Sequence, residues 1–185
     1  MKRSGGLGLL LLLVLLCLPE VRAWMESRMS LHMALELPLL FFAGWLIGSV
    51  APRRWPFLAR VDASGLFSAT TASCILALWM VPAALDMAVL DPAAALLKYG
   101  MWVLAGGVLQ TARSRFTPVI AAFFLANAGW MTASAGLLYL DAEQQLCVNY
   151  LVDDQRTTGF ALIAWGMALG AWALNALRPL VVDTR

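Results

Sequence analysis

Long apolar runs alternate along this chain with short segments that hold arginine, acid and proline. The runs have about the length that a helix needs to cross a bilayer, roughly 20 residues. A backbone in lipid must satisfy its own hydrogen bonds, so each run is expected to be a helix. The sequence therefore predicts an all-α, polytopic membrane bundle with about five transmembrane helices. The expected spans are residues 31–50, 64–85, 93–112, 117–140 and 158–177.

Prolines mark the boundaries of these runs. Most of them lie near expected helix ends, where a missing amide hydrogen costs little. Pro38 and Pro82 instead lie inside expected spans. Both positions are therefore predicted to kink their helices.

The first 23 residues have the three parts of a secretory signal peptide. Lys2 and Arg3 precede an apolar run from residue 7 to 18, and Val21-Arg22-Ala23 ends in a small residue that a signal peptidase reads. The run is too short to span the hydrocarbon core. We expect cleavage before Trp24, which leaves a transmembrane domain of residues 24–185; an uncleaved anchor is the alternative.

Arginines are distributed unequally between the two sets of loops. They follow the first, third and fifth expected spans, whereas the other side has fewer cations and more acids. By the positive-inside rule, the mature N-terminus lies outside and the C-terminus lies in the cytoplasm. This orientation agrees with a cleaved signal peptide.

Composition agrees with a membrane protein and narrows the function. Hydrophobic residues make up 62% of the chain, charged residues 13%, and the mean hydropathy is +0.78. The net charge of +2 and the scattered arginines give no basic surface for nucleic acid. The single histidine excludes a bis-histidine haem, and no hydrolase or phosphate-loop motif occurs. We do not expect an enzyme.

The segment 24–40 carries the strongest chemical signal. At about 100° per residue, one helical arc collects thioether, imidazole and carboxylate side chains at the outer start of the first span. Thioether and imidazole suit copper, Cu(I) in particular, and a carboxylate at membrane depth is costly unless it has a use. The candidate ligands on this arc are Met25, Met29, His32, Met33 and Glu36. Each has a plainer interpretation, as an apolar contact or a snorkelling side chain.

The longest polar stretch, residues 140–159, is expected to supply the second half of the site. It contains Cys147 and Asp154 and leads directly into the last span. We expect it to pack against the arc defined above, with Asp154 as a further candidate ligand. Asp153 and Asp154 could instead cap the last helix. Cys147 could be a reactive thiol or an additional soft ligand.

Two short elements resemble the CtaG-type membrane proteins associated with cytochrome oxidase assembly. That family has an HMxxH-like element followed by proline and leucine, and a later DQ element followed by glycine. His32 and Met33 match the start of the first element, and Glu36 replaces its second histidine. Asp154, Gln155 and Gly159 match the second element. The resemblance implies copper handling for a haem–copper oxidase at the outer face of a bacterial inner membrane.

Three function classes follow from these observations. The first is an assembly protein that binds copper, with an oxidase subunit or a copper chaperone as its partner. The second is an accessory subunit of a membrane complex, suggested by the glycines that let helices approach closely. The third is a small proton or solute carrier that uses Glu36.

Overall fold

The protein is a bundle of helices. A computed structural model describes residues 18–50, 60–147 and 150–182, and every regular element in these ranges is helical. The predicted all-α class is confirmed. The elements are α2 (Pro19–Met25), α3 (Met29–Leu31), the π-helical segment η1 (His32–Glu36), α4 (Leu37–Val50), α6 (Leu66–Trp79), α7 (Pro82–Leu90), α8 (Pro92–Ala112), the 3-10 turn η2 (Arg113–Arg115), α9 (Pro118–Asp141), α10 (Val152–Ala176) and α11 (Arg178–Val182).

The helices are long and apolar enough for a polytopic membrane protein. Four continuous helical stretches in the described ranges qualify as spans: Met29–Ser49, Pro92–Arg115, Pro118–Asp141 and Val152–Leu180. The pair α6 and α7 qualifies as a fifth only when counted together, because the two helices meet at 76°. The number of spans agrees with the sequence prediction, and the second span is broken.

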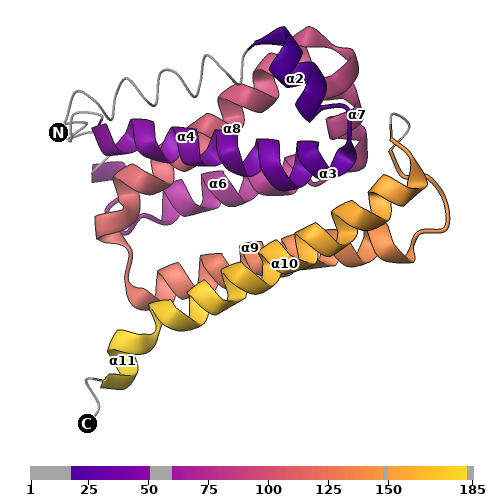
Figure 1. The fold of residues 1–185 in the computed structure, drawn as a ribbon. Coiled ribbons are helices and arrows are strands. Elements are labelled where there is room, and N and C mark those ends of the chain that lie inside the picture. The colour runs from indigo at the N-terminus through magenta and orange to yellow at the C-terminus, as the bar shows by residue number, and fades with distance from the viewer. Residues whose placement is uncertain (1–17, 51–59, 148–149, 183–185) are drawn as a thin grey trace.

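The helices form two groups (Figure 1). α4, α6 and α8 pack together, whereas α9 and α10 form a long hairpin that meets the first group along α3 and η1. α2, α7 and the segment 142–147 all lie at one end of the bundle. We call this end the α2/α7 end. The last helix, α11, lies at the opposite end.

Glycines set the close contacts within each group. A Cβ atom added at Gly44 would lie 1.9 Å from the carbonyl oxygen of Val103, and one at Gly106 would lie 2.0 Å from that of Phe41. These contacts join α4 to α8. In the hairpin, Gly159 of α10 faces Gly136 of α9, where an added Cβ would lie 2.8 Å from the Gly136 oxygen. Small residues thus allow the close backbone packing that associates helices in lipid.

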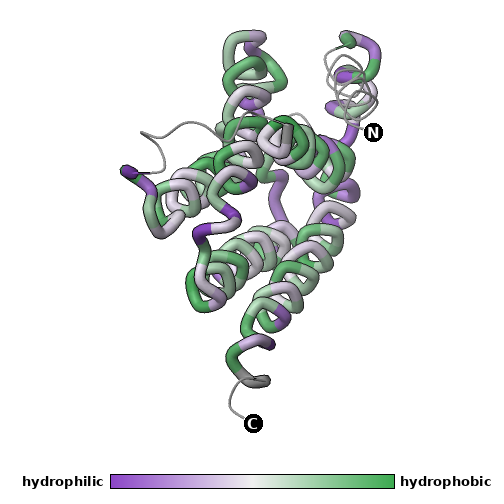
Figure 2. Tube along the Cα trace, turned by 90° about the vertical axis from the view of Figure 1, so that its left-hand side faces the viewer, coloured by the Kyte–Doolittle hydropathy of each residue, from purple (hydrophilic) through white to green (hydrophobic). Residues whose placement is uncertain are grey.

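The outer surface of the bundle is apolar. Trp130 of α9 is 75% exposed and Leu174 of α10 is 72% exposed, and similar side chains cover the other helices. In water such a surface would drive association, whereas a bilayer solvates it. Figure 2 shows hydrophobic residues along the helices and hydrophilic residues mainly at their ends and connections.

The two internal prolines behave differently. Pro82 begins α7 directly after the break at Met80 and Val81, which confirms the kink predicted there. Pro38 lies in the second position of α4, and the first span continues through it without a sharp bend. There the helix widens into η1 immediately before the proline. A π-helical turn accommodates a residue that cannot complete the regular hydrogen-bond ladder.

The last span begins earlier than the sequence pattern predicted. α10 starts at Val152, so Asp153, Asp154 and Gln155 belong to its first turns and not to a loop. Polar residues in a first turn are stabilised by the free amide groups and the dipole of the helix, which hydropathy alone does not register.

The N-terminal helix runs through the expected signal-peptide junction. α2 spans Pro19 to Met25 without interruption at Ala23 and Trp24. Arg22 pairs with Glu26, with 2.9 Å between Nε and Oε2, and donates to the carbonyl oxygen of Ala88 at 3.2 Å. Residues 1–17 lie outside the described ranges. Cleavage before Trp24 stays a prediction.

Candidate functional site

The site forms around the π-helical turn at the start of the first span. His32 and Glu36 are its first and last residues, and the amide of Leu37 donates to the carbonyl oxygen of His32. Both side chains are buried, 1% and 0% exposed. π-Helical turns occur often at functional sites because they redirect side chains within an otherwise regular helix. Here the turn keeps both polar groups inside the bundle.

A tryptophan from the last span stabilises this turn. Pro38 has no amide hydrogen, so it cannot donate to Ala34 as the residue four positions later would in an α-helix. Trp165 Nε1 of α10 donates to the Ala34 carbonyl oxygen at 3.0 Å. The proline therefore frees an acceptor that the opposing helix uses, and the hairpin is tied to the site.

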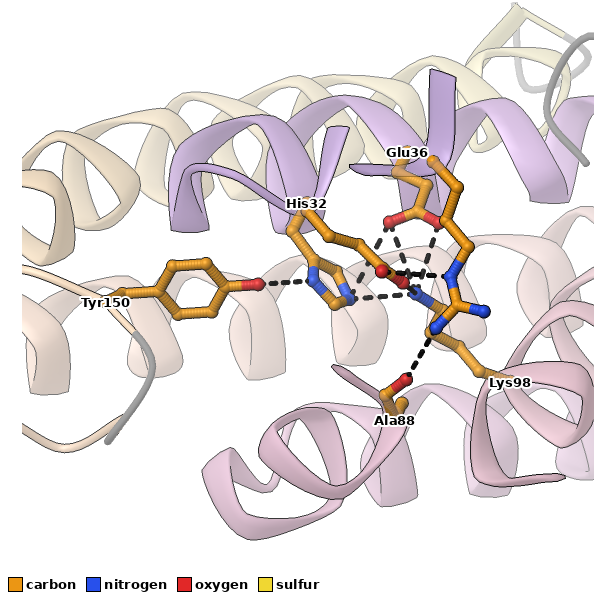
Figure 3. A network of polar contacts seen from close by, with 7 residues as sticks. His32, Glu36, Ala88, Lys98 and Tyr150 are labelled. Carbon is orange, nitrogen blue, oxygen red and sulfur yellow. Dashed lines mark hydrogen bonds and ion pairs between the residues drawn. The ribbon is translucent and has the colours of Figure 1, made fainter. Parts of the chain in front are cut away.

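Lys98 of α8 lies at the centre of the site (Figure 3). Its side chain is fully buried, and its Nζ is 3.0 Å from Oε1 of Glu26 and 3.1 Å from Nε2 of His32. The same nitrogen is 3.1 and 3.2 Å from the two carboxylate oxygens of Glu36. We call Glu26, His32, Glu36 and Lys98 the Lys98 cluster. It joins the N-terminal segment to α8 at the α2/α7 end.

The charges of the Lys98 cluster balance when Arg22, which pairs with Glu26, is counted with it. Glu26 and Glu36 contribute two negative charges, and Lys98 and Arg22 contribute two positive charges. Buried charges are tolerated only when paired and hydrogen-bonded, because desolvation is costly. The arrangement satisfies that requirement without any external group.

The contacts of His32 fix its tautomer. An ammonium group only donates hydrogen bonds, so Nε2 of His32 accepts from Lys98. The ring proton then resides on Nδ1, which is 2.7 Å from the hydroxyl oxygen of Tyr150. Neutral imidazole with its second nitrogen held in this way is the form in which histidine binds metals.

Three side chains of the cluster could hold a metal ion. One ligand atom each from Glu26, His32 and Glu36 lies within 4.8 Å of the others. Imidazole with two carboxylates suits zinc, Cu(II) and similar divalent ions. These residues fit a metal by type and proximity, and Lys98 lies where the ion would be.

The predicted methionine ligands lie in the apolar core. Met25, Met29 and Met33 are buried, at 6%, 1% and 2% exposure, and belong to one hydrophobic cluster with Leu37 and Leu40. The prediction of one continuous helical arc is wrong at its start, because α2 ends at Met25 and the next helix begins at Met29. In the structure, His32 is hydrogen-bonded to Lys98 and Tyr150, and its Nε2 lies 3.7 Å from Oε2 of Glu36.

Asp154 approaches the segment at a different place. Its carboxylate accepts from the hydroxyl and the amide of Ser30, at 2.7 and 3.3 Å. Ser30 lies in the first turn of α3, where free amide groups favour a carboxylate. The predicted packing of the last span's head against the first span is confirmed. Asp154 itself does not belong to the Glu26–His32–Glu36 group.

Gln155 fastens the connecting segment to the head of α10. Its side-chain oxygen accepts from the amide of Leu146 at 2.9 Å, and its nitrogen donates to the carbonyl oxygens of Tyr139 and Gln144. The side chain is 1% exposed. It thereby holds the segment that carries Tyr150 over His32.

Sequence reasoning missed three members of this network. The charge distribution between the loops accounts for Lys98 and Glu26 only as charges on one side of the membrane, and no sequence pattern marks Tyr150. Lys98 gave a usable signal, since it is the single ionisable side chain between Asp91 and Arg113 apart from Tyr99. An ionisable residue inside a span is by default a functional candidate.

Cys147 is neither exposed nor activated. Its side chain is 1% exposed. Both Cys147 and the exposed Cys74 are free cysteines. Burial, together with the negative charge of Asp86, raises the pKa of the Cys147 thiol to about 11. A thiol with so high a pKa is a poor nucleophile at neutral pH, so the interpretation as a reactive outer thiol is not supported.

Comparison of the chain with protein-family models, with curated proteins and with solved structures finds no match.

Proposed function

We propose that this protein handles a transition metal, copper in the first place, for the assembly of a membrane-bound haem–copper oxidase. The observation that carries the proposal is the buried convergence of Glu26, His32 and Glu36, whose ligand atoms lie within 4.8 Å of one another. Burying ionisable groups at the end of a membrane span costs free energy, so their presence there indicates a functional role.

The meeting of the two resembling elements supports the same proposal. His32 and Met33 lie more than 100 residues before Asp154, Gln155 and Gly159 in the chain. In the fold, Asp154 bonds to Ser30, two residues before His32, and Gln155 anchors the segment that carries Tyr150 to His32. Elements that belong to one site in an assembly factor are expected to meet in this way.

The predicted position of the site on the outer side of the membrane supports the same proposal. The arginine pattern predicts that the α2/α7 end faces outward, so the site would receive metal outside the cytoplasm of a bacterial cell. Its partner would be an oxidase subunit or a soluble copper chaperone. The metal is cargo in this account and not a catalytic cofactor.

Copper retention by purified protein tests this function. Detergent-solubilised protein is incubated with copper, desalted and analysed for metal, alongside His32→Ala and the control Gln110→Ala, which alters a buried polar residue farther along α8. We expect His32→Ala to lose most of the retained copper and Gln110→Ala to retain it. In the host, His32→Ala should lower oxidase activity. Unchanged copper and unchanged oxidase activity would refute the proposal.

A second candidate is an accessory subunit that binds no metal. The specific observation in its favour is that the Lys98 cluster, together with Arg22, is already charge-balanced and hydrogen-bonded. On this account the cluster only joins α2, η1 and α8. His32→Ala would then reduce the thermal stability of the protein without altering its metal content.

A further inference from the structure

The ammonium group of Lys98 lies at the focus of the three candidate ligands. Glu26, His32 and Glu36 each direct a lone pair at Nζ, with distances between 3.0 and 3.2 Å. These are the lone pairs that a metal ion would need. Bonds from zinc to imidazole or carboxylate are about 2.0–2.2 Å long. An ion and the ammonium therefore cannot occupy this position together.

Lys98, which occupies the place of the metal ion, and the three candidate ligands come from different parts of the chain. Glu26, His32 and Glu36 all belong to the N-terminal segment 19–36, whereas Lys98 projects from α8. Departure of the lysine side chain would leave the ligand segment and its supports in place. Those supports are the contacts of Tyr150 with His32 and of Trp165 with Ala34.

The types of the ligand atoms favour a divalent ion as the replacement. The ammonium supplies one positive charge between two carboxylates, one of which also pairs with Arg22. Cu(I) carries the same single charge and prefers thioether or thiolate ligands over carboxylates. A divalent ion adds one charge and prefers the nitrogen and oxygen ligands present here. We propose that Lys98 is a resident cation that a divalent metal ion must displace to bind Glu26, His32 and Glu36.

This inference rests on the proposed function, since it assumes that the site takes a metal, and it differs from the sequence expectation in the metal's charge. Met25, Met29 and Met33 predicted a Cu(I)-preferring set, whereas the atoms around Lys98 are nitrogen and oxygen. The lysine would act as a threshold: weak or monovalent cations fail to displace it, and only a strongly binding divalent ion succeeds.

Metal affinities of the purified full chain test the displacement. Zn²⁺, Cu²⁺ and Cu⁺ are titrated against competing chelators with wild type, Lys98→Met and Gln110→Met, the last being a matched change in the same helix. We expect Lys98→Met to bind Zn²⁺ and Cu²⁺ at least about tenfold more tightly than wild type, since a positive charge is removed from beside the ion. Gln110→Met should match wild type, and adding His32→Ala to Lys98→Met should abolish the gain.

The stability of Lys98→Met gives a second readout if its two carboxylates destabilise the fold. We then expect a lowered unfolding temperature that Zn²⁺ restores and K⁺ does not. Equal or weaker divalent binding by Lys98→Met, or no restoration by Zn²⁺, would overturn the inference. Tighter His32-dependent binding of Cu⁺ than of Cu²⁺ would also overturn it, but would leave the proposed function intact. Absence of His32-dependent binding of every metal would defeat the proposed function itself.

Discussion

Individual polar residues in this protein are defined by their partners more than by their type. His32 is positioned by Tyr150 on one ring nitrogen and by Lys98 on the other. Asp154 was a candidate ligand by sequence, yet its carboxylate bonds to Ser30 at the start of the first span. The sequence predicted that the head of the last span packs against the start of the first span, and the Ser30–Asp154 contact confirms this. The sequence could not supply the pairings, because these depend on contacts between residues more than 60 positions apart.

The thiol of Cys147 provides a prediction that depends on pH. Its pKa of about 11 leaves roughly 0.01% of it as thiolate at pH 7. Since the thiolate is the nucleophile, the rate of alkylation should rise about tenfold per pH unit from neutral pH toward pH 11. Timed maleimide labelling of a variant that carries Cys17→Ala and Cys74→Ala, and so keeps Cys147 alone, measures this rate. Rapid labelling at pH 7 in the folded protein would contradict the buried position.

At the scale of the elements, periodicity and length predicted most of the helices but not their interruptions. Hydropathy located the spans to within a few residues except at α10, whose polar first turns it assigned to a loop. Proline signalled both irregular places, since Pro82 begins α7 and Pro38 follows η1. The outcome at each proline depends on packing. The Ala34 carbonyl oxygen, freed by Pro38, accepts from Trp165 of the opposing helix, whereas the Leu78 carbonyl oxygen, four residues before Pro82, accepts from the nearby amide of Val81.

The packing of α4 on α8 should depend on Gly106. A methyl group there would approach the Phe41 carbonyl oxygen to 2.0 Å, so the two helices would have to separate. We expect Gly106→Ala to reduce the free energy of unfolding by about 1–3 kcal/mol, the usual cost of overpacking. Thermal or denaturant unfolding in detergent measures the change.

The same helix offers a matched control. An added Cβ at Gly100 would meet nothing within 4 Å. Gly100→Ala should therefore be neutral, or should stabilise α8 by up to about 1 kcal/mol through helix propensity. Equal destabilisation by both substitutions would show that the α4–α8 contact is looser than the structure has it.

At the scale of the whole molecule, the fold collects its polar chemistry at one end of an apolar bundle. The α2/α7 end holds the Lys98 cluster, the break between α6 and α7, and the segment 142–147 (Figure 1). Charge asymmetry predicted that these elements share a side of the membrane. It could not predict that Lys98 would leave that surface for the interior, because a charge count contains no information on burial.

Orientation of this end is open to a direct prediction. A reporter enzyme that is active only outside the cytoplasm should work when fused after Asp91 or Gln144, since both follow helices that end at the α2/α7 end. Fusions after Arg60 or Arg115 should be inactive, as the positive-inside rule requires. The reverse pattern would place the Lys98 cluster on the cytoplasmic side and remove the outward metal site from the account.

The proposed function requires that His32, Glu26 and Glu36 bind a metal ion. X-ray absorption spectroscopy of the copper-loaded, purified protein observes the ligand atoms themselves. We predict a first shell of nitrogen and oxygen with the outer scattering typical of imidazole, and loss of both the imidazole signal and the bound copper in His32→Ala. A copper spectrum without imidazole, or one that His32→Ala leaves unchanged, would contradict the claim.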